Sequence, residues 1–204
     1  MVAAAGKRLR VYDANRNAIL ADLEAPTRAM ALRMSPDGRR LITIPSYMGT
    51  PAPPVLWDLE QYRIVTLLKE HIGRVFSARF IGEALITAGG DRTARLWDGL
   101  TGRLRQTFRA DVSSNFLADA ILSPDGAMVT AGGGDGLLWF WGVADERPIW
   151  KLQAHNSDLI GLHFEGSDIV TRGSAGEVSR WTLPNPEQVI KACEARKVCA
   201  ILAK

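Results

Sequence analysis

The chain has 204 residues, of which 47% are hydrophobic and 23% are charged, and its formal net charge is +3. These values are typical of a soluble globular protein with a sizeable core, and they argue against a strongly basic nucleic-acid-binding surface. No apolar run approaches the ~18–20 residues that cross a bilayer, and two cysteines with three histidines do not make a zinc-binding set. We therefore expect a cytoplasmic protein without a metal or cofactor, whose partners are neither nucleic acid nor membrane.

The first 70 residues predict two units of short strands. Residues 1–26 form an incomplete unit, with three strands expected at Val2–Ala5, Leu9–Asp13 and Ala18–Leu23. Residues 27–70 begin with an alternating strand at Ala29–Met34. The following Ser35-Pro36-Asp37-Gly38 predicts a tight turn, because proline pre-sets φ and glycine accepts left-handed geometry. The proline-rich residues 45–54 are either a tolerated surface insertion or part of a partner site.

Residues 71–110 are the most regular unit. Leu85–Asp98 predicts two strands that are apolar at alternate positions and joined by a Gly89-Gly90-Asp91 turn. Further strands are expected on either side, at Val75–Phe80 and Arg103–Phe108. Residues 111–155 and 156–184 repeat the arrangement, so that the chain divides into five consecutive units.

The pattern changes after residue 184. Asn185 and Pro186 are suitable residues for the cap and first position of a helix, and Glu187–Arg196 is expected to be helical. Residues 185–204 are therefore expected to form a short, helical C-terminal tail. Within it, the apolar Val198–Ala203 either continues the helix or forms a buried strand.

Tryptophans recur at a nearly fixed spacing. Trp57, Trp97, Trp141 and Trp181 are separated by 40, 44 and 40 residues, and Tyr12-Asp13 extends the series backwards by 45. A period of about 40–45 residues ending in a Trp-Asp-like dipeptide resembles the WD40 family of β-propellers. The resemblance implies an all-β propeller of about four and a half to five blades, each a four-stranded antiparallel sheet. The tail weakly resembles those that follow propellers in some bacterial multidomain WD40 proteins.

The same family resemblance implies a structural role for one set of polar residues. His71, Thr87, Asp91 and Trp97 are expected to form a hydrogen-bonded tetrad, because a buried indole N–H needs an acceptor and an imidazole can link hydroxyl to carboxylate. Partial tetrads are expected from the related positions Thr130, Asp135 and Trp141, and from His155, Thr171 and Trp181. A hydroxyl–His–Asp nucleophile triad is disfavoured, because the threonine lies in mid-strand and Trp97 competes for its hydroxyl. We therefore expect no catalytic residue.

Loops at one rim of a propeller form the usual partner surface in the WD40 family. Counting back along the expected inner strands places Arg28, Arg74, Phe76, Phe116 and Asp158 near that rim. Arginine and aromatic side chains are common in protein-binding hot spots, so these five residues are the candidate protein-binding set. The alternative is that Phe76 and Phe116 only pack between blades.

Three functions are compatible with the sequence. The favoured one is a non-catalytic protein–protein interaction scaffold with an unidentified protein partner. The second is a regulatory or sensor portion of a larger signalling enzyme, such as a kinase or an NTPase-type protein. The third is a ligand-binding or enzymatic five-bladed propeller, which is disfavoured because only Asp158 places a carboxylate near the channel.

Closure of the ring is a separate question. A closed five-blade ring would need Val198–Ala203 to supply the inner strand that the first unit lacks. A partial propeller would take further blades from a longer parent chain, a partner or a second copy. The family resemblance favours the partial propeller, as the C-terminal part of a larger one, because WD40-type blades suit rings of about seven.

Overall fold

The computed structural model describes residues 1–13, 15–46, 50–111 and 114–182. These residues form β-strands joined by turns and loops. None of them forms a helix long and apolar enough to span a bilayer. The predicted helical tail, residues 185–204, lies outside the described residues, and so does the closure through Val198–Ala203.

The strands pair into five antiparallel sheets, which we call blades 1 to 5 in chain order. Blade 1 contains β1 (Val2–Ala5), β2 (Arg8–Asp13) and β3 (Ala18–Glu24). Blade 2 contains β4 (Ala29–Met34), β5 (Arg40–Pro45), β6 (Val55–Asp58) and β7 (Arg63–Leu67). Blade 3 contains β8 (Val75–Ile81), β9 (Ala84–Gly89), β10 (Thr93–Asp98) and β11 (Leu104–Arg109). Blade 4 contains β12 (Leu117–Leu122), β13 (Met128–Gly133), β14 (Leu137–Gly142) and β15 (Trp150–Gln153). Blade 5 contains β16 (Leu159–Glu165), β17 (Asp168–Gly173) and β18 (Val178–Thr182).

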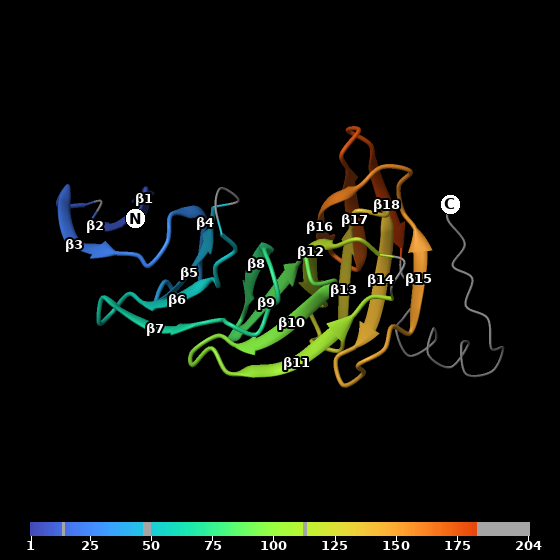
Figure 1. Ribbon diagram of the computed structural model, residues 1–204, viewed down its shortest axis with the longest axis horizontal. Helices are drawn as coiled ribbons and strands as arrows, with labels where there is room; N and C mark the ends of the chain where they lie inside the picture. The colour runs from blue at the N-terminus through green and yellow to red at the C-terminus, as the bar shows by residue number, and fades with distance from the viewer. Residues whose placement is uncertain (14, 47–49, 112–113, 183–204) are drawn as a thin grey trace.

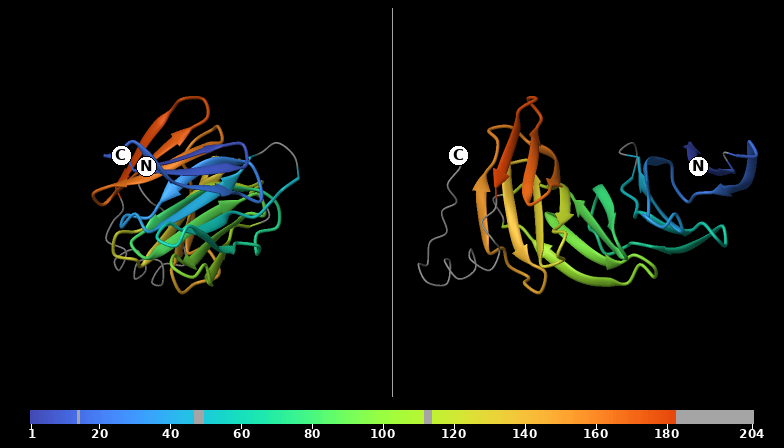
Figure 2. Two further views of the ribbon diagram at one scale, coloured as in Figure 1. Left: turned by 90° about the vertical axis from the view of Figure 1, so that its left-hand side faces the viewer. Right: turned by 180° about the vertical axis from the view of Figure 1, so that it is seen from behind.

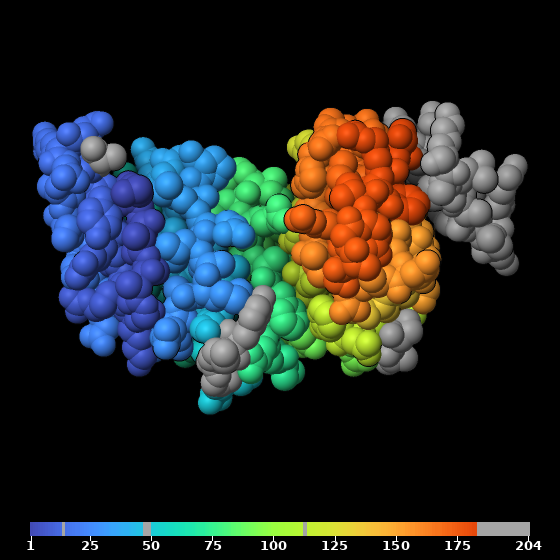
Figure 3. All heavy atoms as spheres, turned by 90° about the horizontal axis from the view of Figure 1, so that it is seen from above, coloured from blue at the N-terminus to red at the C-terminus, as the bar shows by residue number. Residues whose placement is uncertain are grey.

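The blades stand side by side along an open arc (Figures 1 and 2). The strands β8, β12 and β16 are neighbours on its inner side, and β4 contacts β8. Blades 1 and 5 lie at opposite ends of the arc and share no strand pairing (Figure 3). The predicted all-β propeller architecture is confirmed. Among the described residues, blade 1 has no inner strand, as expected, and blade 5 has no fourth strand.

Apolar faces of adjacent blades form the core. Successive strand residues point to opposite faces, so each central strand presents one apolar row to the blade before it and another to the blade after it. Between blades 3 and 4, the buried Ile86 and Leu96 of one blade meet Trp139 and Trp141 of the other. Removing such side chains from water is the main source of stability. The core therefore consists of layers between blades.

One carboxylate links three inner strands. Asp119 of β12 is buried and pairs with Arg79 of β8 in blade 3. The same side chain accepts a hydrogen bond from the backbone N–H of Leu162 in β16 of blade 5, at 3.1 Å. A buried carboxylate is tolerated because it has both a cation and N–H donors. Asp119 thus connects blades 3, 4 and 5 near the inner side of the arc.

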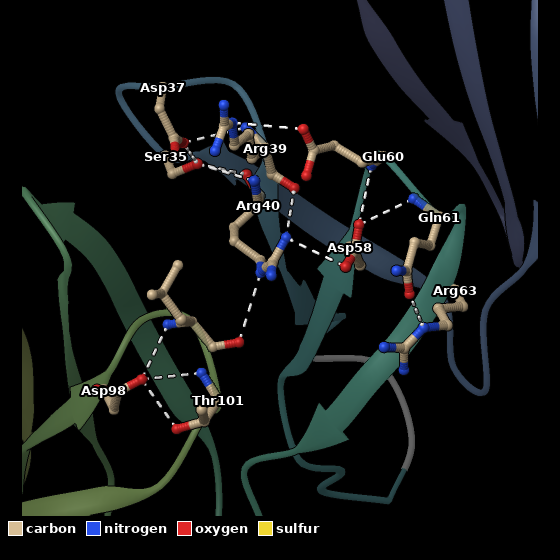
Figure 4. Close-up of polar contacts among 11 residues, drawn as sticks. Ser35, Asp37, Arg39, Arg40, Asp58, Glu60, Gln61, Arg63, Asp98 and Thr101 are labelled. Carbon is tan, nitrogen blue, oxygen red and sulfur yellow. Dashed lines mark hydrogen bonds and ion pairs between the residues drawn. The ribbon is translucent and has the colours of Figure 1, made fainter.

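Turn residues hold blade 2 against blade 3 at one rim (Figure 4). The Ser35 hydroxyl donates to Asp37 in the predicted Ser-Pro-Asp-Gly turn, which fixes its geometry. Asp58 accepts the backbone N–H groups of the turn that follows it, and Arg40 lies 3.2 Å from its carboxylate. Arg40 also donates to the carbonyl of Leu100 in blade 3, at 3.4 Å. Burial raises the pKa of Asp58, but these hydrogen bonds outweigh it and hold the pKa below its usual value.

Candidate functional site

Strand register defines which residues are equivalent in blades 2 to 5. The four tryptophans pair with an apolar residue on the preceding strand: Leu41, Leu85, Val129 and Ile169 in blades 2, 3, 4 and 5. The residue two positions further along that strand lies on the same face as the tryptophan. These residues are Thr43, Thr87, Ala131 and Thr171. The side chain at this position decides whether the indole N–H has a partner.

Blade 3 contains a complete hydrogen-bond chain. The Trp97 indole N–H donates to Thr87 Oγ1 at 2.9 Å, and Thr87 Oγ1 lies 2.7 Å from His71 Nε2. His71 Nδ1 lies 3.0 Å from Asp91. The carboxylate accepts the Nδ1–H, so Nε2 is left to accept the threonine hydroxyl. The four predicted tetrad residues are therefore joined in one network.

The carboxylate of Asp91 has several further donors. The Thr93 hydroxyl donates to it at 2.7 Å, and the buried Arg95 guanidinium lies 3.4 Å away. Burial raises the pKa of Asp91, but the hydrogen bonds from His71 and Thr93 outweigh this effect and lower the pKa far below its usual value. Thr87 is fully buried. Its hydroxyl is thus out of reach of a substrate, which favours a structural role for the network.

Blade 5 contains a similar chain with a different acid. Thr171 Oγ1 lies 2.9 Å from His155 Nε2 and accepts the Trp181 indole N–H at 2.8 Å. Ala175 stands where blade 3 has Asp91, but Glu177 Oε1 lies 3.9 Å from His155 Nδ1. A hydrogen bond from Ser157 lowers the pKa of Glu177. Sequence reasoning missed Glu177, although its place, two residues after the missing aspartate, was the available signal.

Blade 4 corrects one predicted residue. Thr130 pairs with Phe140 and lies on the face opposite Trp141, because the register places Ala131 at the threonine position. Accordingly, the Thr130 hydroxyl and the Trp141 indole N–H have no partner among the described residues. One carboxylate oxygen of Asp135 accepts the Leu137 N–H at 3.0 Å, and the other has no partner within the described ranges. The predicted partial tetrad of Thr130, Asp135 and Trp141 is therefore not assembled in the described structure.

Blade 4 also has no described histidine equivalent to His71 of blade 3 and His155 of blade 5. Asp111, the first residue of the unit 111–155, forms an exposed ion pair with Lys151 at 2.9 Å. The spacing that separates His71 from Arg74, and His155 from Asp158, leads back from Phe116 to Ser113, which lies outside the described residues. In the described part of blade 2, the corresponding chain is reduced to the Trp57–Thr43 bond, at 3.1 Å. Blades 3 and 5 thus carry the extended networks.

The placement of Ala131, rather than Thr130, beside Trp141 can be tested directly. We expect Ala131→Thr to be more stable than Ala131→Val by about 1 kcal/mol, because the hydroxyl gives the Trp141 N–H an acceptor while the two side chains match in volume. Thr130→Val should leave the free energy of unfolding unchanged or raise it slightly, since it removes an unpartnered buried hydroxyl. Urea unfolding of the three variants measures both differences. A large loss of stability in Thr130→Val would contradict the assignment.

The candidate protein-binding residues occupy equivalent backbone positions. The carbonyls of Arg28, Arg74, Phe116 and Asp158 each accept an N–H from the turn between the second and third strands of their blade, Ser46, Gly90, Gly134 and Ser174 respectively. The distances are 2.8, 2.8, 3.3 and 2.8 Å. Four blades therefore present these positions on the same rim. Arg28 is exposed, while Arg74 and Phe116 are half-buried.

A β-bulge follows each of these positions. The register of the inner strand shifts around Met30, Phe76, Ala118 and Ile160. Bulges bend a strand and re-aim side chains, and Met30 and Ile160 are 41% and 50% exposed. The Phe76 and Phe116 rings contact each other across blades 3 and 4, with centroids 5.2 Å apart. They are half-buried, so they pack between blades and also contribute to the rim.

No group of three or more histidine, cysteine, aspartate or glutamate side chains among the described residues is arranged to hold a metal ion. The fold and the repeated Trp–Thr contacts instead define a propeller-type repeat protein. A family model described as "WD domain, G-beta repeat" matches residues 63–98. Residues 63–98 thus match a WD40 repeat, and the fold is that of a WD40-type β-propeller.

Several curated WD-repeat proteins match the chain in part. "WD repeat-containing protein pop1" of Schizosaccharomyces pombe is 30% identical over 112 residues, which are 52% of this chain and 14% of pop1. "Small ribosomal subunit protein RACK1" of Drosophila melanogaster is 27% identical over 89 residues, 44% of this chain and 27% of RACK1. The chain thus spans about a quarter or less of the length of these relatives.

A solved structure shows the same fold. A chain in "Crystal Structure of Mitotic Checkpoint Complex" superposes with a TM-score of 0.73 at 15% identity, covering 89% of this chain and 56% of that chain. At this identity the likeness concerns the fold alone.

Proposed function

We propose that the chain is a non-catalytic protein-interaction scaffold, and that a protein partner contacts the rim at Arg28, Arg74, Phe76, Phe116 and Asp158. The observation that carries the proposal is the equivalence of four rim positions. The same backbone hydrogen bond to the turn occurs in four blades, and the residues at this position are two arginines, a phenylalanine and an aspartate. A repeated frame with varied side chains is suited to recognising a protein surface rather than to a single chemical step.

The polar networks and the similar proteins also support this function. The His, Thr and Asp side chains that resemble a catalytic set are used within blade 3 to hold the indole of Trp97. The solved chain of similar fold is described as part of a protein complex, the mitotic checkpoint complex. RACK1 is described as a ribosomal subunit protein. Assembly with other proteins is thus the common feature of these named neighbours.

Charge reversal at the rim tests the proposal. The double variant Arg28→Glu and Arg74→Glu should weaken capture of a crosslinked native partner about tenfold, because both arginines belong to the contact surface. Arg63→Glu is the matched control, since Arg63 is exposed and lies near the opposite rim (Figure 4). Thermal stability should stay within about 0.5 kcal/mol for either change. The proposed surface would be contradicted if the double arginine variant still captured the partner normally while substitutions on β11 reduced capture.

A further inference from the structure

Ile72 is the apolar side chain that blade 3 presents most openly to water. It lies in the loop between β7 and β8, directly after His71 of the tetrad and two residues before the rim position Arg74. Its side chain is 82% exposed, the highest fraction of any large apolar side chain among the described residues. Single exposed apolar residues are common on protein surfaces, so exposure alone assigns no role to Ile72. What distinguishes Ile72 is the backbone that holds it.

Two features fix the backbone of Ile72. Its N–H donates to Asp91 Oδ2 at 3.0 Å, and that carboxylate is held in turn by His71 and Thr93. The next residue, Gly73, has a φ of 104°, which a residue with a side chain rarely adopts. The tetrad thus presents Ile72 from a rigid backbone, so little conformational entropy is lost when a partner contacts it.

The turn between β9 and β10 carries an arginine at a strained backbone position. This turn contacts the loop between β7 and β8, since Gly90 donates to the Arg74 carbonyl at 2.8 Å. Arg92 has a φ of 61°, whereas glycine occupies the equivalent position in blades 4 and 5, as Gly136 and Gly176. The three are equivalent because the N–H of each donates to the carbonyl three residues earlier. A left-handed φ is unfavourable for arginine and readily adopted by glycine, so the fold itself favours glycine at this place.

The equivalent residues of blade 5 are different in character. They are Asn156, Asp158 and Gly176, which correspond to Ile72, Arg74 and Arg92 of blade 3. Both blades hold a His–Thr–Trp chain with similar distances. Polar and small residues at these three positions are thus sufficient for the fold in blade 5. The isoleucine and the two arginines of blade 3 are therefore available for binding.

Positive charge surrounds the exposed isoleucine. Lys69 in the same loop is exposed, and Arg74 and Arg92 are half-buried at the surface. Glu70 is the exposed acid of this group, because the carboxylate of Asp91 is held within the tetrad. Three cations and one exposed acid give this part of the rim a net positive charge. It is therefore complementary to an acidic partner.

We propose that Ile72, Arg74 and Arg92 form one contact surface, the blade 3 patch, which binds an acidic segment of a partner protein. An apolar side chain of the segment packs against Ile72, and carboxylates on either side pair with the two arginines. The proposal rests on the proposed function, because the patch is part of the same rim, and it adds the chemistry of the partner. The apolar contact supplies affinity, and the arginines select for negative charge.

The probes for the test are short fluorescein-labelled peptides in which leucine alternates with glutamate, leucine with lysine, or serine with glutamate. We expect the full chain to bind the first more tightly than the other two, with an affinity that falls as the salt concentration rises. Ile72→Asn, which copies blade 5, should weaken that binding about tenfold. Leu100→Asn is the matched control, because Leu100 is also an exposed apolar residue of blade 3 but lies at the opposite rim. It should leave binding unchanged.

Arg92→Gly separates a binding role from a structural one. It removes the charge and relieves the left-handed strain. We therefore expect peptide binding to weaken about fivefold, while the midpoint of thermal unfolding rises by about 2 °C. Arg92→Lys keeps both the charge and the strain, and it should retain most of the binding. A lower unfolding midpoint for Arg92→Gly would show that the arginine serves the fold, and would remove it from the patch.

Other results would overturn the proposal. No binding of any peptide, equal binding of the three peptides, or equal binding by Ile72→Asn and Leu100→Asn would each exclude recognition of an acidic, apolar segment by the patch. Equal binding of a single-stranded oligonucleotide would identify a general polyanion site. Concentration-dependent dimerisation that Ile72→Asn abolishes would identify a second copy as the occupant. If the double arginine variant of the rim loses the native partner while Ile72→Asn captures it normally, the patch is wrong and the proposed function stands.

Discussion

Replacement of Asp91 by alanine is expected to lower the free energy of unfolding by about 3 kcal/mol. The change leaves the buried His71 without its carboxylate partner and removes an acceptor from Thr93. The guanidinium of Arg95, which is also buried, loses its counter-charge. Breaking a buried pair by removing one member is costly because the other charge remains desolvated. Chemical denaturation of the purified chain measures the loss.

The pH dependence gives an independent check on Asp91. Its pKa in the folded chain is far below the usual 3.8, so it contributes stability above that value. This contribution is lost as the pH falls through the folded-state pKa. We expect Asp91→Asn to show a shallower loss of stability than the parent chain below about pH 4. Asp22→Asn is the control, because its exposed pairs with Arg8 and Arg10 have a small effect on stability. Superimposable pH profiles for Asp91→Asn and the parent would contradict the network.

Gly133→Ala is expected to cost about 3 kcal/mol and to disturb the rim. A Cβ atom at Gly133 would overlap the backbone carbonyl of Phe116, which cannot move without displacing the inner strand of blade 4. Phe116 contacts Phe76 of blade 3. The substitution should therefore change the near-ultraviolet circular dichroism of the aromatic rings as well as the unfolding midpoint.

Gly161 provides the matched control for Gly133. It lies on the inner strand of blade 5, and a Cβ atom there would meet nothing within 4 Å. Gly161→Ala should be neutral or stabilising by a few tenths of a kcal/mol, because alanine reduces the entropy of the unfolded chain. Equal destabilisation by the two substitutions would show that close approach to Phe116 is not the cause.

Repetition made the fold predictable from sequence. The tryptophans at intervals of 40, 44 and 40 residues mark the third strand of four blades, and the Ser-Pro-Asp-Gly turns mark the end of an inner strand. Each of these signals is local, so it survives in a single sequence. The tetrad of blade 3 was equally accessible, since all four residue types are present at the family spacing.

The strand register in blade 4 and the acidic residue near His155 in blade 5 were harder to predict. Thr130 is one residue from the position it was assigned, and a shift of one residue places a side chain on the other face of the sheet. Glu177 comes within 3.9 Å of His155 from a place two residues after the position equivalent to Asp91.

The Asp119 contacts have a consequence for how the molecule opens. One carboxylate couples blades 3, 4 and 5, whereas the polar link described between blades 2 and 3 is the single donation from Arg40 to Leu100. In a linear array, each sheet opens with a free energy set by its own contacts and those of its neighbours. Amide hydrogens of β12 and β13 should therefore exchange at the global unfolding rate. Amide hydrogens of β2 and β3 should exchange faster, through local unfolding of blade 1 that leaves blades 3 to 5 folded.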